Sequence, residues 1–217
     1  MNIRWNLSGD EIEKESFRVI YEETRNTPLA TLPETEWRVA RRLIHTTTDI
    51  HIADTLTFSN NPIQAGIEAL QKGANIICDS KMIRSGLSLA KLQKINPHYT
   101  EEKLICSISD EDVIAKAKKE GRTRAICAVE KNRHLLDNAI ILVGNAPLSL
   151  AKTVQYVLED NAKPALIIGM PVGFVNVVES KEYLTTCSIP YISLLGRRGG
   201  SALAVTTLHA IMENILD

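Results

Sequence analysis

Five short apolar runs rich in branched residues follow one another beyond Asn60, and stretches of helical character separate them. Alternation of strand and helix along a chain is typical of parallel βαβ units. The runs are continuously apolar instead of alternating, so we expect helices to cover both faces of the sheet. The sequence therefore predicts an α/β fold, a three-layer sandwich around a five-stranded parallel sheet, with strands at 75–78, 104–108, 139–143, 165–168 and 191–195.

The first sixty residues have helical character and precede the sheet. Ser8 and Glu11, and likewise Thr31 and Glu34, have the spacing of a capping box, and each pair stands before a helix-periodic segment. We therefore expect an N-terminal segment of two helices. No repeat or proline-rich linker divides the chain, so a single domain over 1–217 is expected. Further helices are expected near 62–72, 110–120, 123–136, 147–159, 180–186 with Ser180 as N-cap, and 201–216.

Composition excludes several classes of protein. The chain has 25 basic and 26 acidic side chains, so no overall field attracts nucleic acid or an anionic membrane surface. No apolar run approaches the roughly 20 residues of a membrane-spanning helix, and we expect a cytoplasmic protein. Its four cysteines form no C-x-x-C pair, so no metal site is predicted.

Three of the predicted strands lead into loops that contain glycine, IILVGNAP at 140–147, GMPVGFVNVVESK at 169–181 and ISLLGRRGGS at 192–201. The carboxyl ends of parallel strands meet at one edge of an open α/β sheet, where such sheets bind ligands. Backbone N–H groups at 144–146, and those around Gly199 and Gly200, could point toward an anion. Simple turn chemistry is the alternative, but the neighbouring Arg197 and Arg198 favour an anion.

His45 is the best-placed candidate for acid–base chemistry. It stands near the end of the second expected helix, before the hydroxyl-rich run Thr46 to Asp49. The alternative is a histidine that merely complements the C-terminal end of the helix dipole. Arg41 and Arg42 precede His45 by four and three positions, so both can share a helix face with it, and spacing does not choose between them.

These three loops occur in order with Ser16-Phe17, RRLIHTTTD at 41–49 and CDSKMIRSG at 78–86. Over nearly its whole length the chain resembles the precorrin-8X methylmutase or cobalt-precorrin-8 methylmutase family of cobalamin biosynthesis. The resemblance implies an isomerase on a flavodoxin-like sheet that shifts a methyl group from ring carbon 11 to ring carbon 12 of a corrinoid. It implies a homodimer and no required cofactor, with any cobalt carried inside the substrate.

The resemblance also assigns roles to residues. His45 matches the histidine implied to donate and recover the proton, and Arg42 is selected over Arg41 as a partner for a substrate carboxylate. The sequence departs from the family pattern at Thr48, where glycine is common, and at Leu148, where threonine is frequent; Thr48 could form a hydrogen bond to His45. The other substrate contacts expected are Ser16, Thr46, Arg124, Asn145, Gly173, Arg197, Gly199 and Gly200.

Two other functions are open to a chain of this pattern. A carrier could bind the same macrocycle and pass it on without chemistry. An FMN- or phosphate-binding protein could use the crevice at the edge of the sheet. Aromatic residues make up only 5% of the chain, and none of the three glycine loops contains a Trp or Tyr to stack on a flavin. The lack of G-x-G-x-x-G and P-loop patterns argues against nucleotides.

Overall fold

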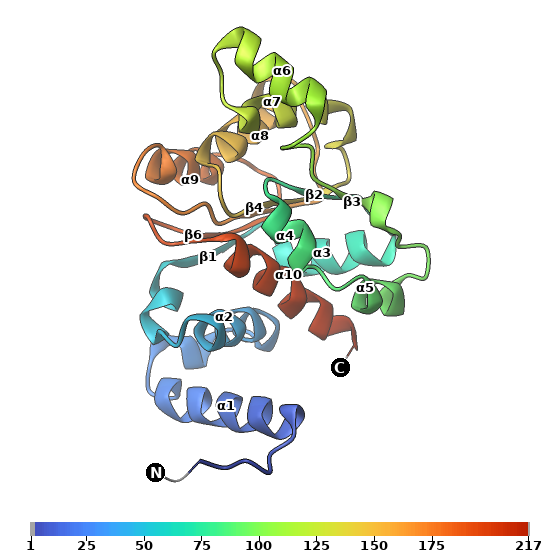
Figure 1. The fold of residues 1–217 in the computed structure, drawn as a ribbon. Coiled ribbons are helices and arrows are strands. Elements are labelled where there is room, and N and C mark those ends of the chain that lie inside the picture. Colours follow the sequence, from blue (N-terminus) through green and yellow to red (C-terminus); the bar gives the residue numbers. More distant parts are fainter. Residues whose placement is uncertain (1–2, 217) are drawn as a thin grey trace.

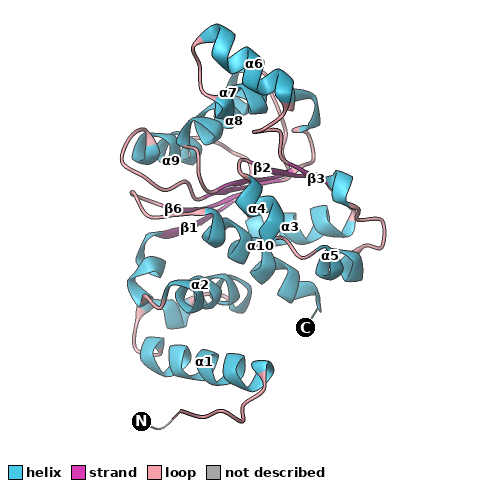
Figure 2. Ribbon diagram, viewed as in Figure 1, coloured by secondary structure: helices cyan, strands magenta, loops and turns pink. Residues whose placement is uncertain are grey.

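The computed structural model describes residues 3–216 as a mixed six-stranded sheet with helices on both faces (Figures 1 and 2). The strand order is β1-β6-β5-β4-β2-β3. Strands β2 to β6 pair in parallel, and β1 pairs antiparallel with β6. The strands are β1 (Leu56–Ser59), β2 (Ile76–Cys78), β3 (Leu104–Ile105), β4 (Ile140–Val143), β5 (Leu166–Gly169) and β6 (Tyr191–Leu194).

The prediction of an all-parallel sheet of five strands is thus corrected to a mixed sheet of six. All five apolar runs form strands, but β1 was missed. Its sequence, LTFS, includes the polar residues Thr57 and Ser59, and all four positions are only partly buried. An edge strand of this kind lacks the continuous apolar character by which the buried strands were recognised.

Helices cover both faces of the sheet because both faces carry apolar side chains. Along β4, Ile140 and Leu142 belong to one hydrophobic core, whereas Ile141 and Val143 belong to the other. Figure 1 shows one group of helices above the sheet, α6 (Glu111–Glu120), α7 (Arg124–Lys131), α8 (Pro147–Glu159) and α9 (Val177–Thr185). Below it lie α3 (Pro62–Gln71), α4 (Lys81–Gly86), α5 (Leu89–Ile95) and α10 (Ser201–Leu216).

The N-terminal helices α1 (Gly9–Thr24) and α2 (Glu34–Thr47) extend this lower side. The Ser8 hydroxyl accepts the Glu11 N–H, and the Glu11 carboxylate accepts the Ser8 N–H at 2.8 Å, which confirms the first capping box. The prediction of a second capping box, at Thr31 and Glu34, was wrong. Thr31 ends a 3-10 turn and donates its hydroxyl to the Pro28 carbonyl at 2.7 Å, and Pro33 takes the N-cap position of α2.

Other helices differ from the prediction. The helix expected over 123–136 ends at Lys131, and the short helices α4 and α5 were not predicted. The start of α9 also differs. Asn176, in the left-handed conformation, stands at the N-cap of α9, and Ser180 is buried inside that helix with its hydroxyl bonded to the Val177 carbonyl. Ser180 is therefore not the N-cap. Four 3-10 turns complete the elements of residues 3–216, namely η1 (Pro28–Thr31), η2 (Ile50–Thr55), η3 (Glu101–Lys103) and η4 (Arg133–Leu135).

Candidate active site

The end of α2 lies at the same edge of the sheet as the carboxyl ends of the parallel strands. Because β1 runs antiparallel, its first residue Leu56 pairs with Leu194, the last residue of β6. The turn η2, which joins α2 to β1, is therefore held beside the loop that follows β6. Asp49, just after α2, forms an ion pair with Arg198 of that loop, and Arg198 lowers the pKa of Asp49.

The backbone N–H groups at 144–146 are already occupied by a carboxylate of the chain itself. Asp79 accepts hydrogen bonds from the N–H groups of Gly144 at 3.2 Å, Asn145 at 2.8 Å and Ala146 at 2.6 Å. Burial raises the pKa of Asp79, and these donors oppose that rise. The predicted anion site in this loop is thus corrected to an internal one. Asn145 can meet a ligand through its exposed side chain instead of its N–H.

The other two glycine loops pack against each other. The Gly200 N–H donates to the Met170 carbonyl at 2.8 Å, and the Gly173 N–H donates to the Arg197 carbonyl at 3.3 Å. A Cβ on Gly199 would lie 2.3 Å from the Met170 carbonyl oxygen, so glycine is required there by close packing. The expectation that the Gly200 N–H would face an anion is wrong, because the neighbouring loop uses it.

The imidazole of His45 faces α1. Its ring lies edge-to-face with Phe17, with 5.3 Å between ring centroids and 73° between planes. His45 and Ser16 line one cavity of about 490 Å³, the α1–α2 cleft. The Ser16 hydroxyl donates to the Ile12 carbonyl at 2.8 Å, so its oxygen can accept a further bond. The cleft is lined by Arg4, Glu15, Ser16, Val19, Ile20, Glu23, Ile44, His45, Thr48 and Ile50.

Arg42 also lies against Phe17 and is paired within the chain. Its guanidinium carbon lies 4.9 Å from the Phe17 ring centroid, and its Nη1 lies 2.6 Å from Glu13 Oε1. It also forms an ion pair with Glu213. The structure places Arg42 near His45, but its guanidinium binds two carboxylates of the protein. A substrate carboxylate would have to displace or join them.

Arg42 lines a second cavity, of about 600 Å³, which we call the basic cleft. Its lining residues are Glu13, Lys14, Phe17, Arg41, Arg42, Lys91, Lys94, His209, Met212, Glu213 and Leu216. The Ser88 N–H donates to His209 Nε2 at 3.3 Å, which marks that nitrogen as unprotonated. Burial, with the nearby charges of Lys91 and Arg42, lowers the pKa of His209 to about 4.

Sequence reasoning missed Glu213 and His209 as neighbours of the site. Both lie on α10, at the opposite end of the chain from α1 and α2. One signal was present: Glu213 is an acidic residue in a mostly apolar helix, and such a residue is rarely buried unless it is paired.

The hydroxyls of the threonines around His45 bond to backbone carbonyls. The Thr46 hydroxyl donates to the Arg42 carbonyl and lies 3.0 Å from the Thr206 hydroxyl on α10, so it joins two helices. Thr48 is the left-handed C-cap of α2, with φ of 54°. Its hydroxyl donates to the Thr47 carbonyl at 2.7 Å. Among residues 3–216 no hydrogen bond joins Thr48 to His45, so the suggested bond is not formed in this structure. The family pattern of glycine at this position suits the left-handed backbone.

Other predicted contacts are not brought to His45 within one chain. Arg124 is exposed at the first residue of α7, across the sheet from α1 and α2 (Figure 1). The Arg197 guanidinium lies 5.5 Å from the ring centroid of Phe174, and both side chains are exposed. Within residues 3–216, the lining of the α1–α2 cleft includes none of Arg124, Asn145, Gly173, Arg197, Gly199 or Gly200.

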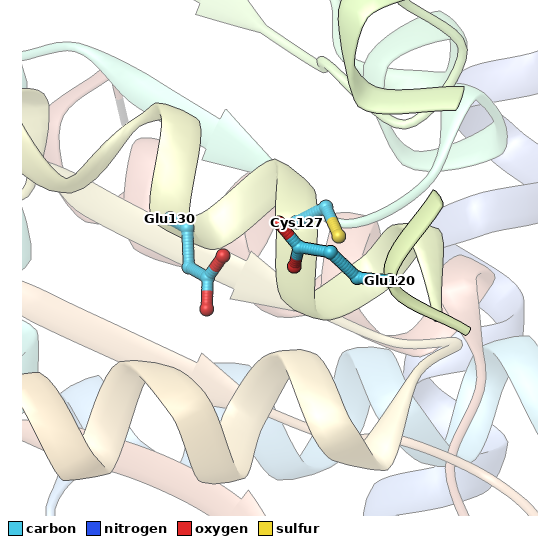
Figure 3. A group of neighbouring side chains, drawn as sticks. All are labelled: Glu120, Cys127 and Glu130. Atoms are coloured by element: carbon cyan, nitrogen blue, oxygen red, sulfur yellow. The ribbon is translucent and has the colours of Figure 1, made fainter. Parts of the chain in front are cut away.

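One group of side chains has the composition of a metal site. Potential ligand atoms of Glu120, Cys127 and Glu130 lie within 4.8 Å of one another (Figure 3). Arg122 forms ion pairs with both carboxylates, and Lys116 lies 2.7 Å from Glu130. These cations already neutralise the carboxylates, so we interpret the group as an ion-pair network.

Fold and cleft together define an α/β protein that carries a histidine and a serine in a helix–helix cleft. The sequence model of the family described as precorrin-8X methylmutase matches residues 11–214. The cobalt-precorrin-8 methylmutase of Leptospira interrogans is 42% identical over 212 residues, which cover 94% of this chain and 93% of that one. The precorrin-8X methylmutase of Pseudomonas aeruginosa is 37% identical over 205 residues, 94% of each chain.

A crystal structure of precorrin-8X methylmutase from Thermus thermophilus has a TM-score of 0.83 at 39% identity, covering 94% of this chain and 95% of that one. The chain therefore belongs to the precorrin-8X methylmutase family, and the resemblance is confirmed. Methylmutases catalyse an intramolecular methyl shift, so it is an isomerase of cobalamin biosynthesis. Among residues 3–216, no helix has the length and apolar character needed to cross a membrane.

Proposed function

We propose that this chain moves a methyl group from ring carbon 11 to ring carbon 12 of precorrin-8X or cobalt-precorrin-8, giving hydrogenobyrinic or cobyrinic acid. One observation supports the proposal most directly. This chain belongs to the methylmutase family, and its His45 and Ser16 line the same cleft. Relatives named for the cobalt form and for the metal-free form match at 42% and 37% identity. The cobalt-free and cobalt-loaded substrates are therefore both to be tested.

His45 acts as the proton donor and acceptor of this reaction. A proton or strong hydrogen bond placed on the conjugated ring draws electron density from it and lowers the barrier to migration of the methyl group. The shift has no net proton change, so the same imidazole recovers its proton afterwards. The edge-to-face contact with Phe17 supports this role, because it limits the orientations of the imidazole ring. The methyl group stays within one molecule, so the proposed reaction needs no separate methyl donor.

The working enzyme is a cytoplasmic homodimer in this proposal. A single chain brings Ser16 and His45 to the α1–α2 cleft but leaves Arg124, Asn145 and Arg197 elsewhere. A second subunit could supply such contacts. Exposed apolar side chains on α1 and in the loop after β5 support a subunit contact, since large exposed apolar groups mark interaction surfaces. They are Ile12, Val19 and Tyr21 on α1, and Val172, Phe174 and Val175 in the loop.

The scaffold in this proposal is one flavodoxin-like domain over 1–217. The order β3-β2-β4-β5-β6 supports this, because it repeats the 2-1-3-4-5 order of flavodoxin-like sheets when β1 is set aside. Residues 1, 2 and 217 of that domain lie outside the part of the chain that the structure describes.

His45→Ala tests the proposed chemistry. The wild-type protein and the variant are incubated with each substrate form, and the absorbance spectrum is followed while NMR assigns the migrating methyl group. We expect the variant to keep the bound pigment and to lose on the order of 10²- to 10⁴-fold in turnover. His51→Ala is the matched control, because His51 is exposed and pairs with Asp54.

Three outcomes contradict the proposal in different ways. Unchanged turnover in His45→Ala removes the catalytic role of the histidine. A wild-type protein that binds the pigment and forms no product is a corrinoid carrier. A purified protein with a flavin spectrum supports the FMN-binding alternative.

A further inference from the structure

Lys181, in the ESK segment and in the middle of α9, takes no part in the proposed reaction and is completely buried, with 0% exposure. Buried lysines are rare unless their charge is paired. Within residues 3–216, no ion pair involves Lys181. Its ammonium instead donates to two backbone carbonyls, Gly196 O at 2.9 Å and Arg198 O at 2.6 Å.

These bonds join the two glycine-containing segments that stood out in the sequence. The Gly196 and Arg198 carbonyls bind Lys181, and the Arg197 carbonyl between them accepts the Gly173 N–H. Three successive carbonyls of the loop after β6 are thus held by residues of the 169–181 segment. Gly196 has φ of 78°, a left-handed conformation within the turn that these bonds stabilise.

The Arg198 side chain of the same loop contacts the segment that follows α2. Arg198, whose carbonyl binds Lys181, pairs through its guanidinium with Asp49. Asp49 also accepts the His51 N–H at 3.0 Å and so fixes the start of η2. It stands two residues after the end of α2 and four positions after His45. A continuous series of contacts therefore runs from Lys181 through the loop and Arg198 to the end of the helix that carries His45.

We propose that Lys181 is a positioning residue for the methyl shift: by holding the Gly196 and Arg198 carbonyls, it directs Arg198 onto Asp49 and fixes the last turn of α2. This role rests on the proposed function of His45. A direct catalytic role for Lys181 does not fit, because its amine is enclosed and lines neither the α1–α2 cleft nor the basic cleft. Burial lowers the pKa of Lys181 to about 8.

The test is a double-mutant cycle on full-length protein with Lys181→Met, Arg198→Met and the double variant. Methionine keeps the length of the side chain and removes its charge. We expect each single variant to lose on the order of 10- to 100-fold in kcat, with KM within about twofold, because a small displacement of a catalytic group is costly. The double variant should lose no more than the worse single variant, since both changes break one series of contacts. Lys118→Met, at an exposed lysine on α6, is the control.

The NMR signals of the His45 ring give a second readout that does not depend on turnover. They should shift in both single variants relative to wild type and stay in place in Lys118→Met. This separates the two proposals: if His45→Ala keeps its activity, the proposed function fails while the shift still reports positioning. Unshifted His45 signals, or losses in kcat that multiply in the double variant, would overturn the role of Lys181. If Lys181→Met does not fold, the kcat values of Arg198→Met and Asp49→Asn test the proposal instead. A kcat equal to that of wild type in both variants would reject it.

Discussion

Arg42 on α2 forms an ion pair with Glu213 on α10, and the Glu213 side chain is only 9% exposed. Arg41 adds a second cation, with its Nη2 at 3.9 Å from the Glu213 carboxylate. The aromatic ring of Phe17 lies beneath both guanidinium groups. Two nearly buried cations therefore share one buried anion between helices from opposite ends of the chain. This arrangement holds α10 against the helix that carries His45.

Removal of that anion should destabilise the fold strongly. Glu213→Gln leaves Arg41 and Arg42 mostly buried without their shared carboxylate, and loss of one partner of a buried ion pair typically costs about 3–5 kcal/mol. We expect the free energy of unfolding, measured by urea denaturation, to fall by about 3 kcal/mol. Glu182→Gln, at an exposed position on α9, should change it by less than about 0.5 kcal/mol. Equal unfolding midpoints for the two variants would show that the ion pairs contribute little.

Thr48→Gly should stabilise the protein. Thr48 has φ of 54°, and a left-handed backbone costs a β-branched residue roughly 1–2 kcal/mol. Part of the gain is lost to the greater entropy of glycine in the unfolded chain, so we expect an increase of about 0.5–1 kcal/mol in the free energy of unfolding. Thr47→Gly is the matched control, because Thr47 is the last residue of α2 and its hydroxyl donates to the Leu43 carbonyl at 2.9 Å. Loss of that bond and the lower helix propensity of glycine should destabilise this variant by about 0.5–1 kcal/mol. Equal destabilisation of both variants would mean that Thr48 is unstrained.

Mild acid should destabilise the fold through His209, because its imidazole takes up a proton more readily in the unfolded chain than in the folded one. Its pKa is about 4 in the folded chain against an ordinary value of 6.5, so between these values the unfolded chain binds more protons. The contribution of His209 is intact above pH 6.5 and is lost progressively as the pH falls toward 4. At pH 5 the loss relative to pH 7.5 should be on the order of 1–2 kcal/mol.

Comparison with His209→Gln isolates this contribution from other acid-sensitive groups. Glutamine can still accept the Ser88 N–H but has no proton to gain in this range. The difference in the free energy of unfolding between wild type and variant should therefore shrink between pH 7.5 and pH 5. His51→Gln, at an exposed histidine, should follow the wild-type curve. Parallel curves for wild type and His209→Gln would refute the assigned pKa.

Features that depend on neighbouring residues could be predicted from the sequence. The five buried strands carry their signal in continuous apolar runs. Helices α8 and α10 have the predicted bounds, and α8 begins at a proline, which is a strong start signal. The Ser8 capping box follows from two residues three positions apart. The family was also recognisable, since its motifs are short segments in a set order. His45 and Ser16 were named together on that basis, and the structure brings them to one cleft.

Contacts between distant segments were decided only by the tertiary structure. The N–H groups at 144–146 look free in the sequence, but all three donate hydrogen bonds to Asp79, which directly follows β2. Arg42 looks available for a substrate until α10 brings Glu213 to it. The sequence by itself determined the layers of the fold and the family, because these depend on local periodicity and motifs. Which polar groups remain free for a ligand depends on the partners that folding brings from elsewhere in the chain, and no local pattern records them.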